Sequence, residues 1–156
     1  MREITVKKGQ ILQRQGDVGT KAFLVKSGLL RSYSIDEKGK EHVFLFASEG
    51  TVVVDHMPPE QPADLFIDAL ENSTVVAKEK SRDFAKRDAL KIVGRITLLQ
   101  KRVIMLMSSS VIERYRYFVK TYPNITERVP QKMIASYLGV TPEALSKAKR
   151  GYLLAK

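Results

Sequence analysis

The sequence predicts an α+β protein in which an antiparallel β-roll is followed by a helical half. Gly28, Gly39 and Gly50 recur every 11 residues, and the segments between them alternate apolar with polar side chains and are rich in β-branched and aromatic types. Beyond residue 80, apolar residues instead recur three and four positions apart, which is the spacing of a helix. We therefore expect three domains or segments, at residues 1–80, 81–109 and 110–156.

The roll is expected to consist of short strands joined by turns. Residues 29–35 and 41–47 form a predicted hairpin, because the charged segment 36–40 between them contains a glycine and has the composition of a hairpin loop. The proline-rich stretch 56–62 lacks the backbone donors of a strand, so we expect a loop there, either one that serves a ligand pocket or an ordinary long turn. Further strands are expected at residues 4–6, 22–25, 65–70 and 74–78.

A long helix is expected over residues 81–109, with Ser81 as its N-cap and Asp83 in its first turn. An apolar stripe along this helix has the alternating spacing of a coiled coil, which favours a seam with an identical helix in a homodimer. The alternative is that the stripe packs on the roll of its own chain. The serines at 108–110 then predict a hinge before a new helix at 111–120. The predicted seam residues are Ile92, Ile96, Leu99, Val103 and Leu106.

The most specific local pattern lies between residues 131 and 150. Ala135 is a small residue that lets a second helix approach closely, and Gly139, four positions later, suits the left-handed backbone of a tight turn. Thr141 provides an N-cap, and Pro142 suits the first position of a second helix. This spacing predicts a DNA-binding helix-turn-helix, and an unrelated helical hairpin is the alternative.

In a helix-turn-helix the second helix enters the major groove, and its first turns face the bases. Here Glu143 can accept a hydrogen bond from a cytosine amino group, and Lys147 can donate to a guanine edge. Basic residues beside them are expected to contact phosphates and so to set the register of the protein on the duplex. The predicted base-reading residues are Thr141, Glu143, Ser146 and Lys147, and the predicted phosphate contacts are Lys132, Lys149 and Arg150.

The formal net charge of +10 lies almost entirely in the second half of the chain. Residues 1–80 carry 11 Lys and Arg against 12 Asp and Glu, a net charge of −1, whereas residues 81–156 carry 16 against 5, a net charge of +11. A basic half of this kind predicts a negatively charged partner, and double-stranded DNA is the partner that fits the helix-turn-helix. An anionic membrane and a merely solvated helix surface are the alternatives.

Composition argues against several other functions. The 156 residues include no cysteine and two histidines, which removes thiol catalysis and iron–sulfur ligation and leaves little for a metal site. We expect no catalytic residues, no metal and no cofactor, and hence not an enzyme. The longest uncharged runs, such as 103–112, are far shorter than the roughly 20 apolar residues of a membrane span, and the amino terminus lacks the apolar segment of a secretory signal. A cytoplasmic protein without membrane partners is therefore expected.

Several motifs together resemble the Crp/Fnr family of bacterial transcription regulators. They are KGQ at 8–10, QGD at 15–17, VKSGL at 25–29 and VPQKMIASYLGVTPE at 129–143, and ERYRYF at 113–118 is similar to the Bacteroidetes-type branch. The resemblance covers nearly the whole chain. It implies a cyclic-nucleotide-binding-like jelly roll, a dimerisation helix and a C-terminal DNA-binding domain, acting as a homodimer on a two-fold symmetric site. It also implies RNA polymerase and an unidentified small-molecule effector as further partners.

The nucleotide pocket of that family uses a Gly-Glu pair to hold the ribose and an Arg to pair with the cyclic phosphate. In this sequence Val54 and Asp55 align with the pair and Ala63 aligns with the Arg, so the effector pocket is degenerate and a response to cyclic AMP is not expected. Pro142 stands where the family's best-known member has a base-reading Arg, so the target sequence is expected to differ. Family members usually begin with a helix before the first strand, which predicts that this chain is a short variant or lacks an amino-terminal piece.

Two other functions fit parts of the sequence. One is a small-molecule-binding jelly roll, or a cupin-like enzyme, whose helical tail only dimerises; its metal site would need more ligands than two histidines supply. The other is a DNA binder without sequence preference or regulatory effector, which Pro142 at a base-reading position favours slightly.

Overall fold

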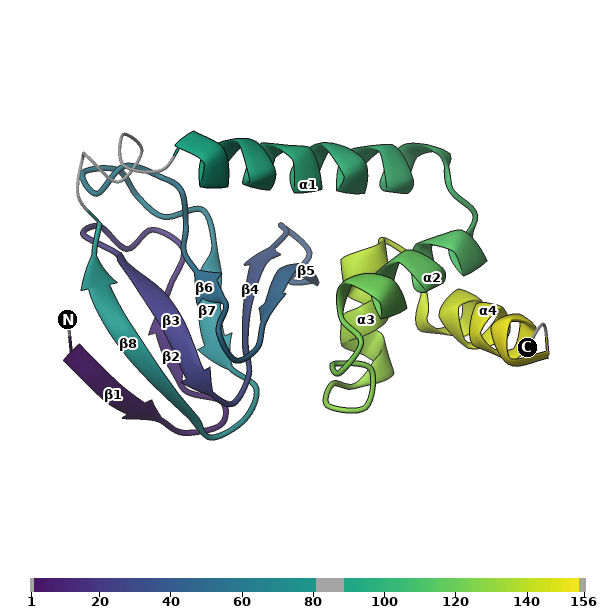
Figure 1. Cartoon of the computed structure of the whole chain (residues 1–156), viewed down its shortest axis with the longest axis horizontal. Helices are drawn as coiled ribbons and strands as arrows, with labels where there is room; N and C mark the ends of the chain where they lie inside the picture. Colours follow the sequence, from purple (N-terminus) through teal and green to yellow (C-terminus); the bar gives the residue numbers. More distant parts are fainter. Residues whose placement is uncertain (1, 81–88, 155–156) are drawn as a thin grey trace. The chain divides into compact units, whose positions relative to one another are not determined.

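The computed structural model describes residues 2–80 and 89–154, and the chain divides into two compact units between Phe84 and Ala85. Within the described residues, the first unit holds eight β-strands and the second holds four helices (Figure 1). This antiparallel sheet core followed by helices agrees with the predicted fold class. The predicted N-cap at Ser81 and first-turn Asp83 lie outside the described residues.

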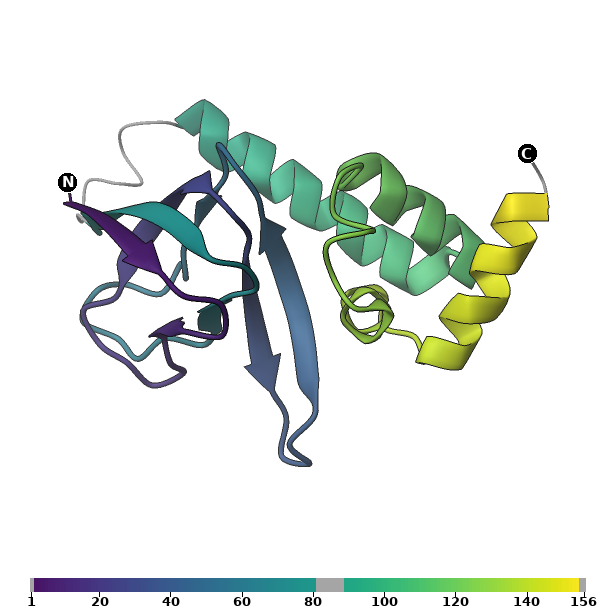
Figure 2. The ribbon, with the colours of Figure 1, turned by 90° about the horizontal axis from the view of Figure 1, so that it is seen from below.

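The first unit is a roll of two four-stranded antiparallel sheets, one ordered β1-β8-β3-β6 and the other β2-β7-β4-β5. Consecutive strands β4 and β5 form the predicted hairpin, which extends beyond the rest of the roll (Figure 2). Strand β8 pairs with β1 and β3, and it thereby brings the end of the roll back to its beginning. The strands are β1 Arg2–Val6, β2 Ile11–Gln13, β3 Lys21–Ser27, β4 Leu30–Ile35, β5 Glu41–Ala47, β6 Val52–Val53, β7 Phe66–Ala69 and β8 Ser73–Glu79.

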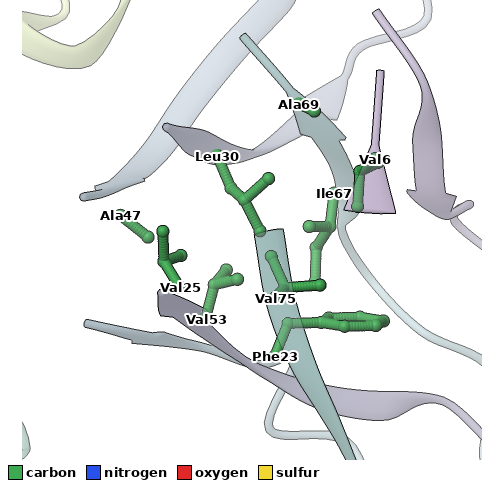
Figure 3. Packing of buried hydrophobic residues seen from close by; sticks show 9 residues of the cluster. All are labelled: Val6, Phe23, Val25, Leu30, Ala47, Val53, Ile67, Ala69 and Val75. Atoms are coloured by element: carbon green, nitrogen blue, oxygen red, sulfur yellow. The ribbon is translucent and has the colours of Figure 1, made fainter. Parts of the chain in front are cut away.

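The core of the roll lies between the two sheets. Val25 and Val75 from the first sheet point toward Leu30 and Ile67 from the second, and all four side chains are fully buried (Figure 3). The predicted strands therefore do place apolar side chains inside the roll. Strand β4 is an exception to simple alternation, because its four consecutive residues from Leu30 to Tyr33 are all buried. The sequence did not predict β2 and β6, because strands of three and two residues are too short to show an alternation.

Gly28, one of the regularly spaced glycines, is required at its turn between β3 and β4. Its backbone has φ +89°, and a Cβ added there would collide with Ser73 and would lie 2.7 Å from the Asn72 carbonyl oxygen. Only glycine combines this backbone conformation with such a close approach.

A buried charged group lies on the second sheet. Arg31 on β4 is 5% exposed, and its guanidinium donates to both carboxylate oxygens of Asp68 on β7, at 2.9 and 3.0 Å, and to Glu41 on β5 at 2.6 Å. Burial by itself lowers the pKa of Arg31, but the hydrogen bonds to the two carboxylates outweigh it, so the net pKa is raised. These bonds join three neighbouring strands and help to define their register.

The second unit contains a long helix and three shorter ones. Its core is formed by Phe118 with Ile134, Leu138 and Leu145, all buried, and Phe118 also packs edge-on against Tyr137 with ring centroids 5.4 Å apart. Burial is the main reason why the pKa of Tyr137 is raised. The helices are α1 Ala89–Ser108, α2 Val111–Thr121, α3 Gln131–Leu138 and α4 Pro142–Leu154.

The break between α1 and α2 lies at residues 109–110, so Ser108 belongs to the helix rather than to the predicted hinge. Ser110 caps α2: its hydroxyl accepts from the Glu113 backbone N–H, and the Glu113 carboxylate accepts from the Ser110 N–H at 2.7 Å. This reciprocal pair is a capping box, which explains why a new helix starts here. None of the helices described has the length and apolarity of a membrane span.

Candidate functional site

Helices α3 and α4 form a tight hairpin, called here the α3–α4 hairpin (residues 131–154). Helix α3 ends at Gly139, whose backbone is left-handed with φ +64°, and the next N–H, of Val140, donates to the Ala135 carbonyl at 3.0 Å. Helix α4 starts after Thr141, whose hydroxyl accepts from the Ala144 N–H at 3.2 Å. The two helices cross steeply, with α3 viewed almost end-on in Figure 2 (α4 in yellow).

Small and apolar residues allow this crossing. Ala135 and Leu138 of α3 and Leu145 of α4 are almost completely buried. Ala135 therefore has the role predicted for it, since a larger side chain there would separate the helices. The two-helix geometry with a three-residue turn is therefore present, as the spacing of Ala135, Gly139 and Thr141 predicted.

The first turns of α4 present polar side chains to solvent. Thr141, Glu143, Ser146 and Lys147, the four predicted base-reading residues, are all exposed. The Ser146 hydroxyl is also in contact with α3, because it accepts a hydrogen bond from the Gln131 amide at 2.6 Å. Thus the four residues lie together at the start of α4, and Ser146 has a partner on α3 that was not predicted from the sequence.

The three predicted phosphate contacts differ in their surroundings. Lys132, at the start of α3, and Arg150, on α4, are exposed. Lys149 is only half-exposed, and its ammonium nitrogen lies 5.9 Å from the centre of the Tyr115 ring on α2. A cation at this distance from an aromatic face interacts with it. Lys149 therefore also contributes to the contact between α4 and α2.

Two arginines connect the carboxyl end of α3 to the long helix. Arg114 of α2 donates to the carbonyls of Leu106, Ser109 and Leu138 at 2.8, 3.0 and 3.1 Å. Arg102 of α1 donates to the Tyr137 carbonyl at 3.2 Å, and its guanidinium lies 4.0 Å from the centre of the Tyr137 ring.

Cations at the carboxyl end of a helix satisfy its unpaired carbonyls and interact favourably with its dipole. Arg102 and Arg114 therefore fix the α3–α4 hairpin relative to α1. From the sequence, Arg114 stands out only as part of the motif ERYRYF at 113–118, and nothing singles out Arg102. A basic residue on a helix carries no signal for which distant carbonyl it will reach.

The apolar stripe of α1 is accessible in the single chain. Ile96 and Val103 of the predicted seam are 58% and 53% exposed, Ile92 is also exposed, and Leu99 and Leu106 are half-buried. Met107, near the end of the same helix, is 80% exposed. A monomeric soluble protein rarely leaves so many large apolar side chains in contact with water along one helix.

The segment aligned with a nucleotide pocket is held by Asp55. This carboxylate is 2% exposed and accepts three backbone hydrogen bonds, from Met57 at 2.8 Å on one oxygen and from Asp64 and Leu65 at 2.8 and 2.9 Å on the other. Both oxygens are therefore used within the loop. The proline-rich stretch 56–62 forms a loop, as predicted. The Lys80 ammonium donates to the Met57 carbonyl in this loop at 3.2 Å. Burial lowers the pKa of Lys80.

The other two pocket positions are apolar and buried. Val54 and Ala63 lie inside the roll, and the Ala63 backbone is bonded on both sides: its N–H donates to the Asp17 carbonyl at 2.9 Å, and its carbonyl accepts from Gly16 at 2.8 Å. A pocket of about 210 Å³ is lined by residues of β2, β3 and the turn between them, among them Gln13, Asp17 and Phe23. Among the described residues, no cluster of His, Cys, Asp and Glu could hold a metal ion.

The chain thus combines an antiparallel β-roll with a long helix and a basic two-helix hairpin. Residues 3–85 match the family "Cyclic nucleotide-binding domain". Electron transport regulator A of Shewanella oneidensis is 25% identical over 94% of this chain and 66% of that protein. The Anaerobic regulatory protein of Haemophilus influenzae is 28% identical over 70% of this chain and 40% of that protein.

The chain thus spans just under two thirds of the first of these relatives and less than half of the second. Solved structures have the same fold. FixK2 from Bradyrhizobium japonicum superimposes with a TM-score of 0.84 at 16% identity, over 99% of this chain and 85% of that one. A CRP/FNR family transcriptional regulator from Thermus thermophilus superimposes with a TM-score of 0.79 at 15% identity, over 99% and 87%. The chain belongs to the cyclic nucleotide-binding domain family and, as its motifs predicted, to the Crp/Fnr regulators within it.

Proposed function

We propose that this chain is a cytoplasmic, homodimeric transcription regulator that reads a two-fold symmetric DNA site with α4 and does not respond to cyclic AMP. The observation that carries the proposal is the exposed polar start of α4 on a tightly packed hairpin, with Glu143 and Lys147 directed to solvent. Helices that read DNA present their first turns in this way. Its relatives are named as regulators, which supports the same function.

The chemistry of the exposed residues suits the major groove. The Lys147 ammonium donates hydrogen bonds and fits the O6 and N7 acceptors of guanine, whereas the Glu143 carboxylate accepts and fits the amino group of cytosine. Lys132 on α3 and Arg150 on α4 are also exposed, so they are suited to neutralise phosphates. RNA polymerase is a further proposed partner, since transcription regulators act on it.

Binding to DNA can be tested by fluorescence anisotropy of the full chain, with a library of palindromic sites compared with random duplex at two salt concentrations. We expect preferred sites whose half-sites lie about 10–10.5 base pairs apart, or a multiple of that distance. Absence of binding at low salt would contradict any function on DNA. Equal affinity for every duplex would instead favour a binder without sequence preference.

Lys147→Ala is expected to relax the base preference at one position of each half-site by roughly 1–3 kcal/mol, because the donor to that base is lost. Lys132→Ala, which removes the same charge from a predicted phosphate contact, is expected to weaken binding to all sequences alike and to reduce the salt dependence. Competition binding against single-base variants of the preferred site separates the two effects. An unchanged preference in Lys147→Ala would mean that this lysine does not read a base.

Cyclic AMP is expected to leave the thermal midpoint of the chain unchanged. Both Asp55 oxygens are already bonded to the backbone, and the position aligned with the phosphate-binding Arg is the buried Ala63. A ligand at a hundred times its dissociation constant would add about 2.7 kcal/mol to the free energy of unfolding, which a thermal melt detects easily. A dose-dependent rise in the midpoint would contradict this part of the proposal. A metabolite panel in the same assay searches for another effector.

A further inference from the structure

Gln131 and Ser146 form a hydrogen bond across the α3–α4 hairpin, next to the proposed DNA-reading surface. Gln131 is the first residue of α3, and its side-chain Nε2 donates to the Ser146 Oγ of α4 over 2.6 Å. Gln131 is half-buried, whereas Ser146 is exposed. The two residues are 15 positions apart, and the turn at Gly139 brings them together.

The direction of this bond determines what Ser146 can offer to a ligand. A hydroxyl has one proton and two lone pairs, and an amide nitrogen can only donate. Ser146 is therefore the acceptor toward Gln131, and its own proton is not used in that bond. No acceptor for this proton is found among the described residues, and the exposed side chain can direct it to solvent. A hydroxyl that accepts one hydrogen bond also becomes a better donor.

We propose that Gln131 is a positioning residue that makes Ser146 a hydrogen-bond donor toward the DNA bases. Ser146 then favours a base edge that accepts, such as guanine O6 or N7, adenine N7 or thymine O4, over the amino group of cytosine. A free serine would discriminate less, since it can donate or accept equally well. This inference rests on the proposed function, because it assumes that α4 enters the major groove.

The decisive variant is Gln131→Glu. A carboxylate can only accept, so Ser146 must donate its proton to Glu and present lone pairs to the groove. The base preference at the position opposite Ser146 is then expected to reverse. The wild type should prefer an accepting edge by about two- to tenfold, and Gln131→Glu should prefer an amino group by a similar factor, which is the range of one net hydrogen bond. Gln131→Ala is expected to relax the preference at the same position without reversing it.

The operator position is identified first, as the one whose preference is lost in Ser146→Ala. All four base pairs at that position are then compared by competition anisotropy for the wild type, Gln131→Ala and Gln131→Glu. Lys132→Gln is the matched control: it changes the charge by the same amount at the neighbouring residue, and it should weaken all four sequences alike. Far-UV circular dichroism shows whether each variant is folded, and Gln131→Ala decides the question if Gln131→Glu does not fold.

The outcomes separate this inference from the function on which it rests. A reversed preference in Gln131→Glu together with a relaxed one in Gln131→Ala supports it. The inference is overturned if both folded variants keep the wild-type preference, or if Ser146→Ala changes no position while the wild type still selects a palindromic site. The proposed function itself fails only if the wild type does not bind DNA.

Discussion

Asp55→Ala is expected to lower the free energy of unfolding by about 3–5 kcal/mol. The substitution leaves the N–H groups of Met57, Asp64 and Leu65 without the carboxylate that now accepts from all three, and each donor left unpaired in this partly buried place costs roughly 1–3 kcal/mol. Urea unfolding of the full chain measures the loss. Hydrogen exchange gives a local readout, because the amides of these three residues should lose their protection.

Two further variants make this result specific. Asp55→Asn keeps one acceptor oxygen, so it should retain part of the bonds and be intermediate in stability. Asp64→Ala removes the same charge from an exposed side chain of the same loop and should change stability by no more than about 0.5 kcal/mol. A loss of less than about 1 kcal/mol in Asp55→Ala would mean that water replaces the carboxylate, and that the loop does not depend on it.

Leu99→Lys is expected to produce monomers and to reduce affinity for a two-fold symmetric site by about 10²–10⁴-fold. Leu99 lies in the middle of the apolar stripe on α1, and a charged side chain in a two-stranded seam would have to be buried without a partner. A monomer engages only one half-site, so the gain from linking two binding units is lost. Sedimentation velocity measures the oligomeric state, and anisotropy measures the affinity.

Thr97→Lys provides the control for this experiment. It introduces the same side chain on the same helix, but two positions along a helix correspond to a rotation of about 200°, so residue 97 faces away from the seam. Thr97 is exposed in the chain, and a dimer should persist. If Leu99→Lys remains a dimer with unchanged affinity, the stripe does not form the seam, and packing on the roll of the same chain becomes the better explanation.

The proposed lack of a response to cyclic AMP follows from two positions together, Asp55 and Ala63. Asp55 is one methylene shorter than the Glu of the family's pocket motif, and here its carboxylate is used to hold the loop closed. Ala63 brings no cation to pair with a phosphate and is itself packed inside the roll. The roll keeps the family's fold because its core depends on apolar residues such as Val25 and Ile67, none of which belongs to the pocket.

Features that depend on near neighbours were predictable from the sequence. The β4–β5 hairpin follows from the turn segment 36–40 between two alternating strands. The left-handed turn at Gly139 and the cap at Thr141 depend on hydrogen bonds within five residues, so the local residue types specify them. The same holds for the start of α2, where the expected break appears one residue later than predicted because Ser108 extends α1.

Contacts between distant residues were decided only by the tertiary structure. Arg31 meets Asp68 across 37 positions, Arg114 meets Leu138 across 24, and Gln131 meets Ser146 across 15. A polar side chain looks the same in the sequence whether it is solvated or bonded to a distant group, since its partner depends on which strands pair and how helices cross. The sequence by itself therefore determined the succession of roll, long helix and helical hairpin and the residues that α4 exposes. The roles of Asp55, Arg114 and Gln131 became visible only once the fold had brought their partners within hydrogen-bonding distance.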